Sequence, residues 1–196
     1  MQLPFPALSL VVSAYFLGAI PFGLVVSTLK GINLREIGSG NIGASNVYRA
    51  MGLKWAGVVF FLDGLKGFLP TAMAIHFYPN HPIFHVFIGL LTVVGHSFPI
   101  FARFRGGKGA ATGVGVLLGL HPLTFLCVAP VVIAIIAATR MVSAASITGA
   151  VLTPILLILF HAPRPYWILA VVIAAVIIFR HRSNIQRLLA GTENKV

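Results

Sequence analysis

Long apolar runs alternate with short polar stretches along the chain. The runs are rich in Leu, Ile, Val, Phe and Ala, and charged residues, glycine and proline bound them. Because a helix needs about 20 mostly apolar residues to cross the hydrocarbon core of a bilayer, this pattern indicates membrane spans. We therefore predict an all-α integral membrane protein with seven transmembrane helices, at residues 3–29, 55–78, 82–102, 108–120, 122–140, 143–161 and 164–180.

The composition supports a membrane protein and limits what else the chain contains. Of the 196 residues, 58% are hydrophobic and only 9% are charged, which lies outside the range of soluble globular domains. Seven spans leave no room for a separate soluble domain, so we expect residues 1–196 to form a single membrane-embedded domain. The first apolar run lacks a basic leader and a small-residue cleavage site, and we expect it to be retained as the first span.

The basic residues predict an orientation in the membrane. The chain has 14 Lys and Arg against 3 Asp and Glu, a net charge of +11. In a membrane protein such an excess reports orientation and contact with anionic lipid, and it does not point to nucleic acid. The Lys and Arg in the loops and at the ends of the predicted spans all fall on one side, except Arg164. This bias predicts an N-terminus outside and a C-terminus in the cytoplasm.

Four polar stretches meet at the cytoplasmic face of this predicted bundle. Each combines at least one Lys or Arg with small or hydrogen-bonding residues, so we expect a site for an anionic ligand there. The stretches are "GSGNIGASNVYRA" (38–50), "RFRGGKGAATG" (103–113), "TRMVSAAS" (139–146) and "RHRSNIQRLLAGTE" (180–193).

The stretch 103–113 has the residue types of a phosphate-binding loop. Gly106, Gly107 and Gly109 flank Lys108, and the next span begins directly afterwards, near Thr112. Glycine lets backbone N–H groups approach a ligand closely, and a helix N-terminus adds unpaired donors. The spacing is not that of a Walker A loop. A tight cytoplasmic turn with a basic residue is the alternative.

The stretch 38–50 offers neutral and cationic ligand groups. Ser39 and Asn41 supply neutral donors and acceptors, and Arg49 offers a bidentate fork for phosphate or carboxylate. The alternative is a loop followed by a helix that Ser or Asn caps, with Arg49 extended towards the membrane surface.

Two serines and a histidine are further candidates near the C-terminal spans. Ser143 and Ser146 share a helical face, and without a G-x-S-x-G elbow we expect hydrogen bonding to a ligand, or bonding back to the helix, instead of nucleophilic attack. His181 suits proton transfer near neutral pH, and Asn184 and Arg187 share its face if the last helix continues. Alternatively this tail anchors the chain on anionic lipid.

Other ionisable residues have less certain roles in the sequence. Asp63 and Lys66 lie three residues apart within a predicted span. They have either a functional role or form a structural ion pair. His76, His81 and His85 cluster near an outer end, but no acidic residue lies close to them in sequence, and we expect no metal there.

The motifs resemble those of the bacterial acyl-phosphate-dependent glycerol-3-phosphate acyltransferases of the PlsY type. The resemblance rests on "SGNIGASN" continuing to Arg49, on "GGKGAAT" and on "HRSNIQRLLAGTE", and "RMVSAAS" also resembles that family's serine-bearing segment. One departure is Ser45, where the family commonly has threonine. The resemblance covers the chain from the first span to Glu193.

This resemblance implies a seven-helix enzyme of the bacterial inner membrane with its active site facing the cytoplasm. Such enzymes transfer a fatty acyl group from acyl phosphate to the 1-hydroxyl of glycerol 3-phosphate, giving lysophosphatidic acid and phosphate. The implied catalytic residues are Arg49, Lys108, Ser146, His181 and Asn184. The implied substrate-binding residues are these five together with Ser39, Asn41, Gly106, Gly107, Gly109, Thr112, Ser143 and Glu193.

The mechanism we expect is direct attack by the glycerol hydroxyl on the acyl carbonyl, with a substrate phosphate or His181 accepting the proton. We expect no cofactor and no obligate protein partner. We expect contact with membrane lipid. Acyltransferases with an H-x₄-D pair are excluded because the only aspartate, Asp63, has Val58 five positions before it. An anion or lipid transporter and a lipid-binding scaffold are the rival classes; the odd span number and the lack of repeats argue against a transporter.

Overall fold

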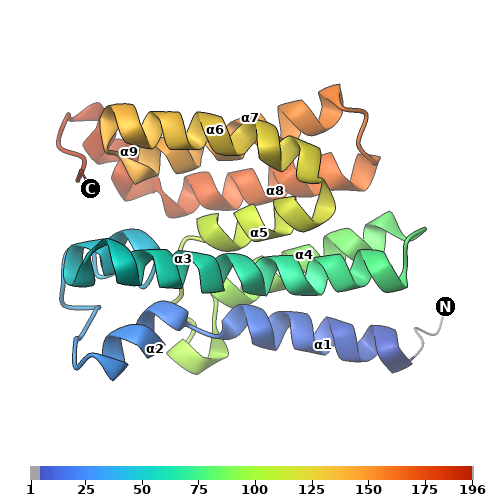
Figure 1. Ribbon diagram of the computed structural model, residues 1–196, viewed down its shortest axis with the longest axis horizontal. Helices are drawn as coiled ribbons and strands as arrows, with labels where there is room; N and C mark the ends of the chain where they lie inside the picture. Colours follow the sequence, from blue (N-terminus) through green and yellow to red (C-terminus); the bar gives the residue numbers. More distant parts are fainter. Residues whose placement is uncertain (1–4, 196) are drawn as a thin grey trace. The chain divides into compact units, whose positions relative to one another are not determined.

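The computed structural model describes residues 5–195, and helices with their connecting loops make up the described chain. Two compact units divide it, Met1–Leu120 and His121–Val196. The helices of the first unit are α1 (Phe5–Ala19), α2 (Phe22–Leu29), α3 (Ala44–Phe77), α4 (Pro82–Ser97), the short 3₁₀ helix η1 (Ile100–Ala102) and α5 (Ala110–Leu120). Those of the second are α6 (Pro122–Thr139), α7 (Val142–Leu159), α8 (Arg164–Arg180) and α9 (Arg182–Leu189) (Figure 1).

The predicted all-α membrane architecture is confirmed. The number of spans is determined less exactly than the seven that the sequence predicts. Among the described residues four helices are long and apolar enough to cross a membrane, or up to six if each of two bent pairs forms one span. The apolar helix α5 is shorter, with 11 residues, or about 16 Å of helix at 1.5 Å per residue. The seven-helix count and the orientation of the two ends stay predictions.

The predicted first span is a broken helix instead of a continuous one. Its residues 3 and 4 lie outside the described residues, and the remainder forms α1 and α2, which meet at an angle of 45°. The break falls at Ile20 and Pro21, between the two helices. Proline carries no backbone N–H and its ring clashes with the preceding helical turn, which favours a kink or a break at this position.

Small residues let the helices of unit 1 approach closely. Helix α3 packs against both α4 and α5, and α1 packs against α4. A Cβ atom at Gly67 of α3 would collide with the carbonyl group of Thr112 in α5, and one at Gly115 of α5 would collide with the carbonyl of Gly64 in α3. Such close backbone contacts replace the hydrophobic driving force that water supplies to soluble bundles.

Helix α3 is longer than the predicted span and is bent near its start. It begins at Ala44, and Gly52 interrupts it with φ 79° and ψ −177°. A positive φ of this size favours glycine. Residues 44–51 therefore form a separate first segment that carries Arg49. Gly43 occupies the N-cap and no side chain caps the helix, so the alternative in which Ser or Asn caps this helix is wrong.

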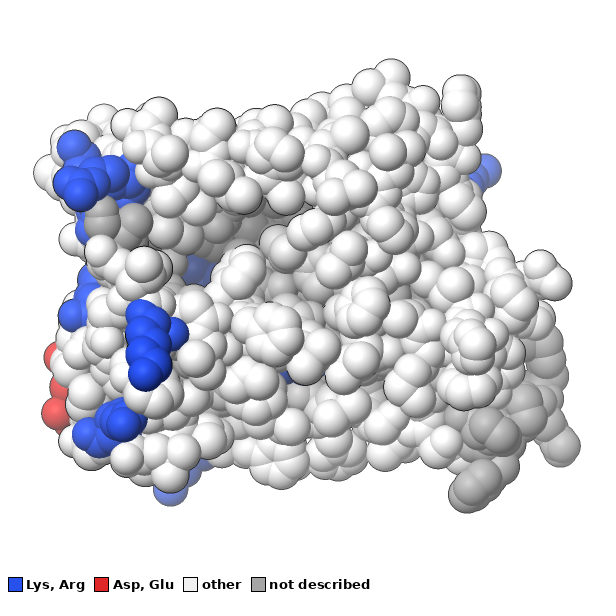
Figure 2. All heavy atoms as spheres, in the orientation of Figure 1, with Lys and Arg blue, Asp and Glu red and all other residues white. Residues whose placement is uncertain are grey.

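In unit 2, α7 packs against both α6 and α8. The tail does not extend α8 in a straight line, because α9 follows at an angle of 63°. The straight continuation of the last helix, on which the shared face of His181, Asn184 and Arg187 was conditional, is therefore not found; His181 is instead the N-cap of α9, which carries the other two residues. Within each unit most Lys and Arg atoms gather towards one end of the helices, whose sides are largely uncharged (Figure 2).

Candidate functional site

The loop before α3 is organised by the buried side chain of Asn46. Its amide nitrogen donates to the carbonyl oxygens of Leu34 and Ile37 at 3.0 and 2.9 Å, and its Oδ1 accepts from the backbone N–H of Ser39 at 3.0 Å. Only 1% of Asn46 is exposed. One amide thus makes three bonds and fixes the path of residues 34–39, because a buried amide left unbonded would be costly.

The predicted ligand groups of this loop occupy different environments. Ser39 is exposed, and Asn41 and Arg49 are partly buried. The Asn41 Oδ1 accepts from the backbone N–H of Gly43 at 2.9 Å and stabilises the turn into α3. Gly38 has φ 56°, and a Cβ there would lie 3.3 Å from Cδ of Arg49. The loop therefore packs close to the stem of the Arg49 side chain.

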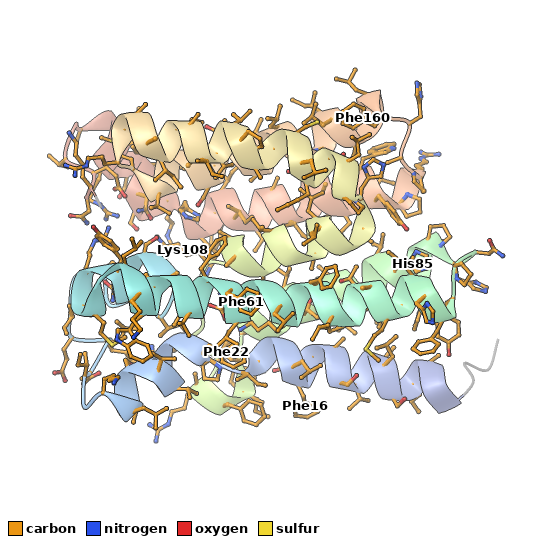
Figure 3. All side chains as sticks on the ribbon, in the orientation of Figure 1. Phe16, Phe22, Phe61, His85, Lys108 and Phe160 are labelled. Atoms are coloured by element: carbon orange, nitrogen blue, oxygen red, sulfur yellow. The ribbon has the colours of Figure 1, made fainter. Side chains whose placement is uncertain are left out.

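The glycine-rich loop lies between η1 and α5, as the sequence predicted. Gly106 and Gly107 rest on the end of α4: the N–H of Gly107 donates to the carbonyl of His96 at 3.2 Å, and a Cβ at either glycine would collide with His96. Gly109 has φ 84° immediately before α5 begins. Lys108 sits between these glycines and is partly buried (Figure 3). The backbone geometry brings a lysine to a helix N-terminus, where anions bind favourably.

Thr112 lies deeper than a ligand group on the surface of the site would. Its side chain is fully buried, and its hydroxyl oxygen has no hydrogen-bond partner among the described residues. Its methyl and carbonyl groups face Gly67 of α3. Thr112 therefore contributes to the packing of α5 on α3.

In unit 2, a single carboxylate gathers the polar residues of the tail. The Glu193 Oε1 accepts from the hydroxyl of Ser143 at 2.8 Å and from the amide of Asn184 at 2.6 Å, and its Oε2 accepts from Nε of Arg187 at 2.8 Å. These donors come from α7 and α9. The carboxylate thus ties the end of the chain to both helices.

Glu193 keeps its charge in this setting. Burial raises the pKa of its carboxyl group, but the hydrogen bonds from Asn184, Ser143 and Arg187, together with the charge of Arg187, outweigh burial and hold the pKa below its ordinary value of 4.5. Donors aimed at a carboxylate favour its ionised form. The contact is therefore strongest at neutral pH.

His181 stands at the bend between α8 and α9. The residue is 4% exposed, and its Nδ1 lies 2.8 Å from the carbonyl oxygen of Ile177. Because a carbonyl only accepts, this contact places the proton on Nδ1 and makes Nε2 the basic nitrogen. The hydroxyl of Ser146 donates to the carbonyl of Val142 at 2.8 Å, which is the backbone bonding that the sequence left open as an alternative, and its oxygen can still accept.

In unit 1, Ser39, Asn41 and Arg49 lie in or against one loop, and Lys108 lies in a glycine turn. In unit 2, hydrogen bonds join Ser143, Asn184 and Glu193 in one network. The sequence reasoning did not assign the organising role of Asn46, nor the bond from Arg187 to Glu193. An asparagine in a glycine-rich stretch and the last acidic residue of the chain were the available signals. Among the described residues no three His, Cys, Asp or Glu side chains group to hold a metal.

The motifs and the fold match proteins of known class. The family model described as glycerol-3-phosphate acyltransferase matches residues 8–191. The glycerol-3-phosphate acyltransferase of Aquifex aeolicus (strain VF5) is 46% identical over 189 residues, which cover 96% of this chain and 98% of that protein.

Two solved structures are similar along almost the whole chain. Both are crystal structures of PlsY (YgiH), an integral membrane glycerol 3-phosphate acyltransferase. The glycerol 3-phosphate form has a TM-score of 0.94 and 45% identity and covers 97% of this chain and 96% of its own. The lysophosphatidic acid form has a TM-score of 0.91 and 44% identity and covers 97% and 95%. The family that the motifs indicated is therefore confirmed, and the chain belongs to the glycerol-3-phosphate acyltransferases.

Proposed function

We propose that the protein transfers a fatty acyl group from acyl phosphate to the 1-hydroxyl of glycerol 3-phosphate, forming lysophosphatidic acid and inorganic phosphate. The observation that carries the proposal is the likeness, along nearly the whole chain, to a membrane acyltransferase solved with glycerol 3-phosphate and with lysophosphatidic acid. Acyl phosphate as donor is supported by the cations at glycine-rich turns, which suit a second phosphate besides that of the acceptor.

The reaction needs little covalent chemistry from the protein. The glycerol hydroxyl attacks the acyl carbonyl carbon, a tetrahedral intermediate forms, and the bond from carbon to the phosphate oxygen breaks. The hydroxyl proton passes to a phosphate oxygen of a substrate or to Nε2 of His181. Phosphate is a good leaving group, so positioning and charge neutralisation supply most of the rate.

The cations are assigned to the two substrate phosphates. Lys108 is held at the N-terminus of α5, where its ammonium group and the backbone N–H groups favour the same anion. Arg49 supplies a fork that binds two phosphate oxygens at once. Ser39, Asn41 and Ser146 are assigned to substrate binding as neutral hydrogen-bonding groups. Two dianions close together repel each other, and these cations offset that repulsion.

Glu193 and Ser143 receive a revised role. Both carboxylate oxygens of Glu193 already accept hydrogen bonds, and a carboxylate repels phosphate. We therefore assign Glu193 to positioning Asn184 and Arg187, with Ser143 as one of its anchors, and we propose that this cluster and the glycine loop serve the same reaction. Thr112 takes part through the packing of α5 on α3.

The location follows from the charge bias. We propose a bacterial inner-membrane enzyme that crosses the membrane seven times, with the two bent pairs and α5 each counted as one span. The N-terminus is outside, and the candidate site and the C-terminus face the cytoplasm, where positive charges concentrate. No cofactor and no obligate protein partner enter this scheme.

The test of the donor compares two activated acyl groups. Purified protein in detergent or lipid is given glycerol 3-phosphate with palmitoyl phosphate or with palmitoyl coenzyme A. We expect lysophosphatidic acid and stoichiometric phosphate from the first donor only. Turnover with the coenzyme A ester alone would remove acyl phosphate from the proposal and leave the acceptor intact.

A further inference from the structure

Three buried ionisable side chains form a connected group in the interior of unit 1. Asp63 and Lys66 belong to α3 and His96 to the last turn of α4, and at most 5% of each residue is exposed. The ammonium group of Lys66 lies 2.7 Å from Oδ1 of Asp63, and Nδ1 of His96 lies 3.6 Å from the same oxygen. Ionisable groups within a membrane bundle are costly and seldom lack a function.

One end of this group holds the break in the first span. The ammonium group of Lys66 donates to the carbonyl oxygen of Ile20 at 2.7 Å and lies 5.5 Å from the ring centre of Phe22. The carbonyls at the end of a helix have no partner within that helix. Lys66 therefore joins the end of α1 to α3.

The other end supports the glycine-rich loop from beneath. The carbonyl of His96 accepts the N–H of Gly107 at 3.2 Å, and the imidazole packs directly against the same residue: the three atoms that a Cβ at Gly107 would meet first all belong to the His96 ring. Lys108 follows Gly107 in the chain. Any displacement of the imidazole is therefore passed to the backbone that carries Lys108.

We propose that Asp63, Lys66 and His96 act as positioning residues for the loop 106–109, with Asp63 orienting the His96 ring and the ring fixing Gly107. None of the three touches substrate in this scheme. Nδ1 of His96 has no hydrogen-bond partner among the described residues and lies 3.6 Å from Oδ1 of Asp63, so the charge of the carboxylate favours the ring orientation that points an Nδ1–H group towards it. The substrate affected is the phosphate bound by Lys108, and to that extent the inference rests on the proposed function.

The first experiment measures the loop without measuring activity. Hydrogen exchange of backbone amides, followed by mass spectrometry in detergent, is compared for peptides covering residues 103–112. We expect His96→Ala and Asp63→Asn to speed exchange in the loop by about tenfold, because local opening becomes easier. His85→Ala is the matched control: His85 is a buried histidine of the same helix whose Nε2 bonds to the carbonyl of Tyr78 at 2.7 Å, and it lies far from Lys108 (Figure 3).

The second experiment measures the kinetic parameters for both substrates. A positioning role raises KM by about tenfold and leaves kcat within about threefold. We expect KM to rise for the same substrate whose KM rises in Lys108→Arg. His96→Asn keeps an amide near the position of Nδ1 but withdraws the ring from Gly107, so it should behave as His96→Ala does; it also serves if the alanine variant does not fold.

A steric double mutant separates this role from general stabilisation. Gly107→Ala places a methyl group against the imidazole, and His96→Ala in the same chain removes the obstacle. We expect the loss caused by Gly107→Ala to be smaller in the His96→Ala background, a coupling that independent sites do not show.

Unchanged exchange in the loop of folded His96→Ala, or an equal increase in His85→Ala, overturns the inference. Failure of the wild-type protein to form lysophosphatidic acid would instead count against the proposed function, because hydrogen exchange reports the loop in either case.

Discussion

Glu193→Gln tests whether one carboxylate holds the C-terminal tail. The substitution keeps the shape of the side chain but removes its charge. A glutamine oxygen still accepts from Ser143 and Asn184, whereas its NH₂ group faces Nε of Arg187, which is also a donor. The tail therefore loses one bond completely and keeps two in weaker form.

The size of the effect follows from the number and kind of these bonds. Two bonds change from charged to neutral, each at a cost of about 1 kcal/mol. The side chain of Arg187 is 32% exposed, so its lost ion pair is discounted for solvent to about 1 kcal/mol. The total of about 3 kcal/mol would raise the undocked fraction of the tail about a hundredfold, at 1.4 kcal/mol per factor of ten.

Limited trypsin digestion measures this fraction. Cleavage after Arg187 within α9 requires the tail to open, and its rate follows the open population when reclosing is fast. We expect loss of residues 188–196 to accelerate strongly in Glu193→Gln. Glu36→Gln, which neutralises an exposed carboxylate, is the control and should digest as the wild type does. A rate for Glu193→Gln within about twofold of the wild type would refute the assigned role.

The same contact predicts a pH dependence. The pKa of Glu193 is lower in the folded protein than its ordinary value of 4.5, so its stabilisation is fully present above that value and is lost as the pH falls through the folded pKa. We expect the difference in Tm between wild type and Glu193→Gln to be constant from neutral pH down to about pH 5 and to shrink at lower pH. A difference that grows on acidification would contradict this reading.

Five further substitutions test the candidate site and the loop beside it. Arg49→Ala and Lys108→Ala should each lower kcat/KM by at least about a hundredfold in a continuous phosphate-release assay, because charge offset is lost; near-normal turnover would end their assignment. Ser146→Ala should weaken turnover through substrate contact and leave Tm unchanged, whereas Ser143→Ala should lower Tm by releasing Glu193; the reverse pattern would exchange their roles. Asn46→Leu leaves buried backbone groups unpaired and should destabilise the loop 34–39 by about 2 kcal/mol, seen as faster local hydrogen exchange; unaltered exchange would show that the loop does not depend on this amide.

The apolar runs predicted most of the helices because burial in lipid requires continuous hydrophobic length. Runs 122–140, 143–161 and 164–180 match α6, α7 and α8 within one or two residues. The broken first span was not predicted, although Pro21 is visible in the sequence, because hydropathy alone does not register the loss of one N–H. The segment 44–51 was missed for a related reason: its polar residues read as a loop, and the helical segment ends at a glycine with positive φ.

The sequence indicated residue types for the candidate site, whose roles stay predictions, but it did not indicate most of their contacts. Glycine-rich turns with lysine or arginine indicate anion binding, and for this reason Lys108 and Arg49 were identified as candidates from the sequence. The partners of Glu193 depend on the tail folding back from α9, where Gly191 has φ 69°, and no local pattern sets that path. Similarly, the contact of His96 with Gly107 joins residues from two elements, and it became visible only in three dimensions.

The most direct test of the central claim is the product formed from palmitoyl phosphate and labelled glycerol 3-phosphate by the purified protein. We predict labelled 1-palmitoyl-glycerol 3-phosphate with one phosphate released per acyl group transferred, and no product from Lys108→Ala of equal fold and amount. Folded wild-type protein that releases no phosphate and forms no lysophosphatidic acid would contradict the account.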